Sequence, residues 1–79
     1  MKREIPNNIE AEQSVLGSMF LSKEAVIKAL ESLSQESFYL DKHGKIFEAI
    51  RNLYNSNVAI DLTTVTNELK NKQELDAIG

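Results

Sequence analysis

The sequence contains no cysteine, a single proline and only three glycines. Without cysteine the chain has no disulfide, no thiolate nucleophile and no cysteine-ligated metal site. The scarcity of proline and glycine leaves most of the 79 residues free to form helices. No stretch approaches the ~20 consecutive apolar residues of a membrane-spanning helix, and the basic start MKRE lacks the apolar region of a signal peptide. We therefore expect a helical, cytoplasmic protein without a membrane segment.

The composition itself is that of a globular domain, with 42% hydrophobic and 27% charged residues. This length suits one small domain over residues 1–79, with a free energy of unfolding of roughly 4–12 kcal/mol. The formal net charge of −3 counts against a surface that neutralises phosphates, because nonspecific affinity for nucleic acids comes mainly from lysine and arginine. We expect little direct binding to nucleic acids.

Polar residues that can accept backbone hydrogen bonds precede each predicted helix. The predicted elements are a first helix entered through Pro6, Asn7 and Asn8, a second over residues 23–33 after Ser22, a single turn after Ser34, a third over 42–56 capped by Asp41, a fourth over 62–71 capped by Asp61, and a last turn ended by Gly79. The β-branched run 63–66 also suits a strand, but the aspartate cap and the helical spacing of apolar residues favour a helix. The fold class is therefore all-α.

Apolar residues recur at helical spacing, most clearly in the third predicted helix, where they fall within an arc of about 120°. The first helix has a wide apolar arc, so we expect it to be central and to contact more than one neighbour. Tyr39 and Leu62 are also expected to face inward, and Lys45, Glu48 and Asn52 to face water. The predicted core consists of Ile9, Leu16, Phe20, Leu30, Phe38, His43, Ile46, Phe47, Ile50, Leu53, Tyr54 and Leu69.

No residue pattern points to catalysis, a cofactor or a metal. Glu10 and Glu12 are two residues apart on a helix and point about 160° from each other, so they cannot share a substrate. His43 has no second histidine and no cysteine as a co-ligand, which favours a core or boundary histidine with one hydrogen-bonded nitrogen. Phosphate-binding glycine motifs and a nucleophile elbow are absent. We expect a protein that is not an enzyme.

Two kinds of binding surface remain open. The third and fourth helices could form a helix-turn-helix that reads DNA through Thr63, Thr64, Asn67, Lys70 and Asn71, although the surrounding charge is unfavourable. Alternatively, the first helix has a ridge whose small residues would let another backbone approach closely. This ridge consists of Glu10, Ser14, Gly17 and Ser18. That ridge is either covered by another helix of the domain, solvated, or left for a partner.

Three segments in order resemble the N-terminal domain of bacterial replicative DNA helicases of the DnaB family. IPNNIEAEQSVLGSMFL at residues 5–21 is similar to the proline, polar spacer and I-E-A-E-Q-x-V-L-G that open that domain. FYLDKHGKIFEAIRNLY at 38–54 resembles its F-Y-x-x-x-H-x-x-I-F-x-A-I-x-x-L-Y segment. IDLTTVTNELKNKQELDAIG at 60–79 resembles its D-x-x-T-V/L-x-x-E-L run. The resemblance therefore covers nearly the whole chain.

The resemblance implies a compact bundle of about six short helices, followed in such helicases by a helical hairpin, a linker and a RecA-like motor domain that binds ATP and magnesium. In the family these head domains form a collar on the hexameric ring and help to dock the C-terminal helical domain of the primase. It therefore implies an interaction module of the primosome in the bacterial cytoplasm, with no cofactor of its own and with Glu10, Ser14, Gly17 and Ser18 as the candidate contact. A stand-alone helix-turn-helix protein is the alternative.

Overall fold

The computed structural model describes residues 9–71. They form α1 (Ile9–Leu21), α2 (Lys23–Ser32), the single-turn 3₁₀ helix η1 (Gln35–Ser37), α3 (Asp41–Asn55) and α4 (Leu62–Asn71). The all-α prediction is confirmed, but these residues form four α-helices and one 3₁₀ turn rather than about six helices. The expected cap at Pro6–Asn8 and the last turn with Gly79 lie outside the described residues. Within 9–71 no helix is long and apolar enough to cross a membrane.

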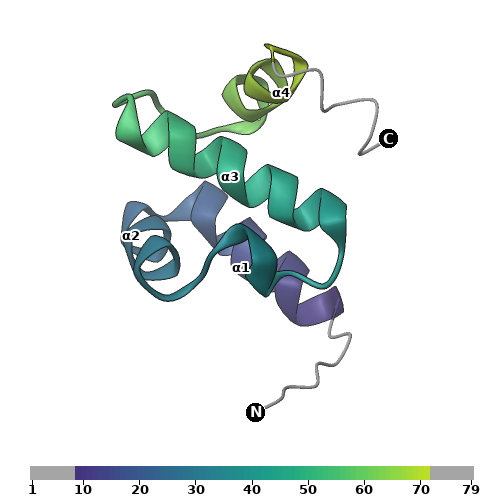
Figure 1. The fold of residues 1–79 in the computed structure, drawn as a ribbon. Coiled ribbons are helices and arrows are strands. Elements are labelled where there is room, and N and C mark those ends of the chain that lie inside the picture. The colour runs from purple at the N-terminus through teal and green to yellow at the C-terminus, as the bar shows by residue number, and fades with distance from the viewer. Residues whose placement is uncertain (1–8, 72–79) are drawn as a thin grey trace.

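Helix α3 runs through the middle of the molecule, with α1 and α2 on one side and α4 on the other (Figure 1). It packs against α1, η1 and α4, whereas α1 packs against α2 and α3. The expectation that α1 contacts more than one neighbour is thus met. Its central position was predicted wrongly, because α3 is longer and buries small residues such as Ala49 in addition to its main apolar stripe.

Side-chain caps begin two of the helices as the sequence predicts. The N–H of Ala25 donates to Ser22 Oγ at 3.2 Å. At α4 the Thr64 N–H donates to Asp61 Oδ1 at 2.8 Å, and the Asp61 N–H donates to Thr64 Oγ1 at 3.0 Å, which is a reciprocal capping box. Asp41 is not a cap. It is the first residue of α3, Leu40 occupies the cap position without a side-chain bond, and the Asp41 carboxylate instead lies 3.6 Å from Lys45 Nζ.

The sequence NSN at residues 55–57 stands at the C-terminus of α3, and its last residue has a left-handed backbone. Asn57 has φ 62°, its N–H donates to Tyr54 O at 3.1 Å, and the Val58 N–H donates to Leu53 O at 2.9 Å. This pair of bonds is a Schellman motif, in which asparagine tolerates the left-handed backbone better than other non-glycine residues. The motif fixes the direction in which the chain leaves α3 toward α4.

A single hydrophobic core joins all the helices. Phe47 and Ile50 are fully buried, and the Phe38 and Phe47 rings lie 5.2 Å apart between centroids. The residues expected in the core that are buried are Leu16, Phe38, His43, Phe47, Ile50, Leu53 and Leu69, and those that are half-buried against it are Phe20, Leu30, Ile46 and Tyr54.

Four expectations about burial need correction. Ile9, the first residue of α1, is 38% exposed and does not belong to the core. Tyr39, which follows the buried Phe38, is 61% exposed, and Leu62, the first residue of α4, is 74% exposed. Asn52 was expected to face water, but its Nδ2 donates to Glu68 Oε2 of α4 at 3.3 Å.

Candidate partner-binding surfaces

The ridge on α1 is open along its length. Glu10, Ser14, Gly17 and Ser18 are all exposed, and a Cβ added at Gly17 would meet no atom within 4 Å. The residues described at 9–71 therefore contain no helix that covers this ridge, and the small side chains leave it accessible to solvent or to a partner. Ser18 Oγ donates to the Val15 carbonyl at 2.8 Å, which satisfies its hydroxyl within the helix.

The two glutamates of α1 point in different directions, as their spacing predicts. Glu10 is exposed, whereas the Glu12 side chain is 13% exposed and turns toward the start of α3. Glu12 Oε2 accepts the N–H of Tyr39 at 2.5 Å, and Oε1 accepts the N–H of Leu40 at 3.4 Å and lies 2.7 Å from His43 Nδ1. One carboxylate thus ties α1 to the residues that lead into α3.

The electrostatics of this contact favour an ionised Glu12. Burial by itself raises the pKa of the Glu12 carboxyl, but the hydrogen bonds from His43 and from the Tyr39 and Leu40 N–H groups outweigh it and hold the pKa below its ordinary value. His43 is buried with one hydrogen-bonded nitrogen, in agreement with the sequence prediction. No group of three or more potential metal ligands occurs within residues 9–71. We assign the pair a structural role.

Gly44 shows why η1 lies close to α3. A Cβ at this position would stand 2.8 Å from the carbonyl oxygen of Gln35, closer than carbon and oxygen atoms approach without a shift of the backbone. Gly44 therefore permits the close packing that sets the loop between η1 and α3 against Glu12. Sequence periodicity could not predict the contact between Glu12 and His43. These two residues are 31 positions apart, and they interact through polar atoms rather than through an apolar stripe.

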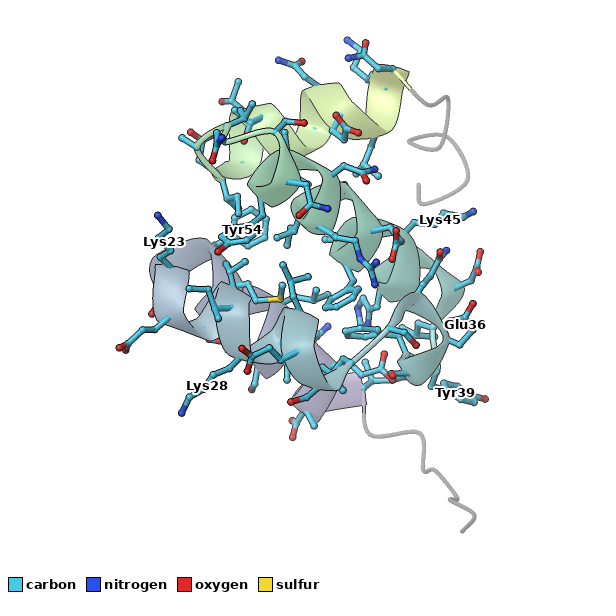
Figure 2. The ribbon with its side chains drawn as sticks, turned by 60° about the vertical axis from the view of Figure 1, so that its left-hand side comes forward. Lys23, Lys28, Glu36, Tyr39, Lys45 and Tyr54 are labelled. Carbon is cyan, nitrogen blue, oxygen red and sulfur yellow. The ribbon has the colours of Figure 1, made fainter. Side chains whose placement is uncertain are left out.

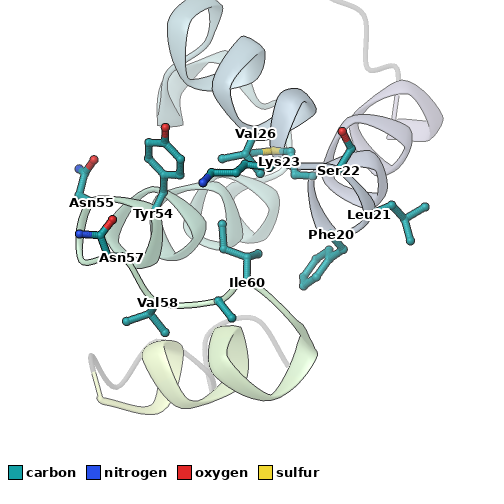
Figure 3. Close-up of a pocket in the computed structure, with 12 residues that line it drawn as sticks. Phe20, Leu21, Ser22, Lys23, Val26, Tyr54, Asn55, Asn57, Val58 and Ile60 are labelled. Atoms are coloured by element: carbon teal, nitrogen blue, oxygen red, sulfur yellow. The ribbon is translucent and has the colours of Figure 1, made fainter.

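A groove of about 570 Å³ opens between the junction of α1 with α2 and the link from α3 to α4 (Figure 3). Sequence patterns could not indicate this groove, because its walls come from two segments far apart in the chain. The residues that line it are Met19, Phe20, Leu21, Ser22, Lys23, Val26, Tyr54, Asn55, Asn57, Val58, Ala59 and Ile60.

The pair α3 and α4 exists, but it offers less to DNA than a helix-turn-helix requires. The Thr64 hydroxyl is engaged in the cap of α4 and donates to the Ala59 carbonyl at 2.8 Å, so it is not free for a base edge. Thr63, Asn67, Lys70 and Asn71 are exposed on α4, and Lys70 is the only basic residue within that helix.

Comparison with known proteins identifies the family. A family model described as "DnaB-like helicase N terminal domain" matches residues 4–79. The chain is 46% identical over 74 residues to the replicative DNA helicase DnaB of Rhodothermus marinus, and 45% identical over 74 residues to that of Geobacillus stearothermophilus. Both alignments cover 94% of this chain but only 8% and 16% of the relatives' lengths.

The fold agrees with that assignment. The crystal structure of the N-terminal domain of DnaB helicase from Mycobacterium tuberculosis superposes with a TM-score of 0.88 at 41% identity, covering 96% of this chain and 53% of that chain. The match lies in the N-terminal domain of these helicases and not in their catalytic motor domain, and it does not favour the helix-turn-helix alternative. The chain therefore belongs to the family of DnaB-like helicase N-terminal domains.

Proposed function

We propose that this chain is the protein–protein interaction module of a hexameric replicative helicase in the bacterial cytoplasm. In that role it contributes to the collar of the ring and docks the C-terminal helical domain of the primase. ATP and magnesium would act in the motor domain of the parent protein, and the chain itself would bind no cofactor and little nucleic acid. Membership of the family of DnaB-like helicase N-terminal domains supports the part of this proposal that places the chain in a replicative helicase.

The observation that carries the docking proposal is the open ridge on α1. Helix interfaces require a surface that backbone or side chains can approach closely, and the space beside Gly17 provides one. Glu10 stands in the first turn of α1, exposed and without an ion pair among the described residues. A carboxylate in this position attracts a lysine or arginine of a partner and affects association rate and specificity more than the fold.

Calorimetric titration with the C-terminal helical domain of the cognate primase tests the proposal. Glu10→Lys is expected to weaken binding, while the fold loses only the few tenths to about 1 kcal/mol of a favourable helix-dipole contact. Glu24→Lys is the matched control, because Glu24 is an exposed acidic residue in the first turn of α2 and lies off the ridge. Equal affinities for the two variants would remove Glu10 from the interface, and no binding by the wild type would contradict docking through this chain alone.

A salt titration with duplex DNA separates the proposal from direct DNA binding. A phosphate-contacting protein loses affinity steeply as salt increases. We expect no appreciable binding even at low salt. Salt-sensitive binding to the duplex would instead support the helix-turn-helix alternative.

A further inference from the structure

The groove has an apolar floor and a rim on which apolar and polar side chains are mixed. Met19 and Val26 are buried at its base, and Tyr54 and Ile60 are half-buried beside it. Leu21 stands at the edge with 88% of its surface exposed. Exposed apolar side chains around a groove are in contact with water, and a partner that covers them removes that apolar surface from water.

The groove also has one cation at its mouth and no anion. Among the described residues that line it, Lys23 alone is charged. Lys23 is exposed and forms no ion pair with the residues at 9–71, and Figure 3 shows its side chain crossing the opening toward Tyr54. A chain with a net charge of −3 thus places an ammonium without an ion pair among the described residues at the entrance of this groove.

Two amide side chains lie on the wall formed by the end of α3. Asn55 and Asn57 line the groove near Tyr54 (Figure 3), and neither side chain makes a hydrogen bond within the described part of the chain. Asn57 belongs to the Schellman motif, so its backbone is held in place before any partner arrives. Together with Lys23 these amides offer hydrogen-bond donors that suit a carboxylate.

We propose that this groove binds a peptide segment of another protein in which large apolar side chains stand next to a carboxylate. The apolar side chains would pack on the exposed Leu21 and Val58 at the rim, and the carboxylate would pair with Lys23. A second copy of the chain is a poorer occupant, because symmetric pairing through this face would bring two Lys23 ammonium groups together and the groove lining supplies no carboxylate to separate them. The proposal goes beyond the docking ridge and does not depend on Glu10 or on a primase.

Two synthetic peptides test the charge requirement. One alternates leucine pairs with glutamate, and the other has every glutamate replaced by glutamine. In amide NMR spectra of the 79-residue chain, the glutamate peptide is expected to shift signals of residues 19–26 and 54–60, and to bind about two- to fivefold more tightly than the glutamine peptide, as an exposed ion pair does. Lys23→Glu should abolish or reverse that preference.

Matched variants distinguish a local contact from a change in overall charge. Lys28→Glu changes the net charge by the same amount on the same helix but lies outside the groove lining (Figure 2), so it should keep most of the preference. Leu21→Ser should weaken both peptides, whereas Leu62→Ser, at another exposed leucine, should not.

Several results would overturn the proposal. These are equal binding of the two peptides, equal effects of Lys23→Glu and Lys28→Glu, signal shifts that map elsewhere, or no binding at millimolar peptide. Concentration-dependent shifts of the groove signals without peptide would identify a second copy as the occupant and would also contradict the proposal.

Discussion

Replacing Glu12 with glutamine tests the contact that ties α1 to the start of α3. The side chain keeps its shape, but one carboxylate oxygen becomes an NH₂ group that cannot accept a hydrogen bond. The carboxylate accepts from His43 Nδ1 at 2.7 Å and from the Tyr39 N–H at 2.5 Å through different oxygens, so the amide can satisfy only one of these donors. The remaining donor, either His43 Nδ1 or the Tyr39 N–H, then faces the glutamine NH₂ group, which is itself a donor.

The size of the effect follows from that loss. A hydrogen bond to a charged group contributes about 1.5–3 kcal/mol, and a donor left unsatisfied costs a similar amount when it is buried. The Leu40 N–H, at 3.4 Å, adds little, and water can reach the exposed Tyr39 side of the contact. We expect Glu12→Gln to lower the free energy of unfolding by about 1.5–3 kcal/mol, and Glu10→Gln, at an exposed position on the same helix, to change it by less than about 0.5 kcal/mol.

The pH dependence gives a second, independent readout. The folded state lowers the pKa of Glu12, so its contribution to stability is complete above the ordinary pKa of glutamate and is lost as the pH falls through the lowered value. Urea unfolding followed by circular dichroism should therefore show a difference between wild type and Glu12→Gln that is constant near neutrality and shrinks in acid. A difference below about 0.5 kcal/mol at neutral pH, or one that does not shrink in acid, would refute the assignment of Glu12 as an ionised acceptor.

Three further predictions concern packing and assembly. Phe47→Ala should lower the free energy of unfolding by about 3–5 kcal/mol in chemical denaturation, because it empties the centre of the core, and a loss below about 1 kcal/mol would contradict the packing of α3. Gly44→Ala should destabilise the fold through the clash with Gln35, whereas Gly17→Ala, in open space, should stabilise it by about 0.5–1 kcal/mol, and equal melting temperatures for the two variants would be inconsistent with this difference. At micromolar concentration sedimentation equilibrium of residues 1–79 should report mostly monomer, because the resemblance implies that the helical hairpin of such helicases supplies much of their dimer contact. A stable hexamer would show that the head alone carries ring formation.

Periodicity and capping residues were sufficient to predict the described helices. Ser22, Asp61 and the NSN sequence mark boundaries through local hydrogen bonds that the chain can make with near neighbours. The aspartate at the start of α3 misled the prediction because the helix begins one residue earlier, so that the N–H groups of His43 and Gly44 donate to the Leu40 carbonyl. The N–H groups of Tyr39 and Leu40, just before the helix, donate to Glu12 of α1. Such a contact depends on how α1 and α3 are placed, which no local pattern records.

The ridge on α1 could be predicted from the spacing of residues on one helix, whereas the groove could not. The open ridge on α1 was one of the alternatives that helical spacing left, and the space around Gly17 decides against coverage by the described helices. The groove could not be predicted, because its walls meet only after the α1–α2 junction and the α3–α4 link come together. Ala29 and Ala49 are buried, but alanine is common on both faces of a helix and gives a weak signal.

The position of α4 has a consequence for how the molecule opens. α4 packs chiefly on α3 and buries only Val65 and Leu69, whereas α3 also holds α1 and η1. Fluctuations that detach α4 therefore expose less apolar surface than those that disrupt α3, and they leave most of the core intact. The amides of α4 should therefore exchange with deuterated water as a cooperative unit before those of α3 around Phe47.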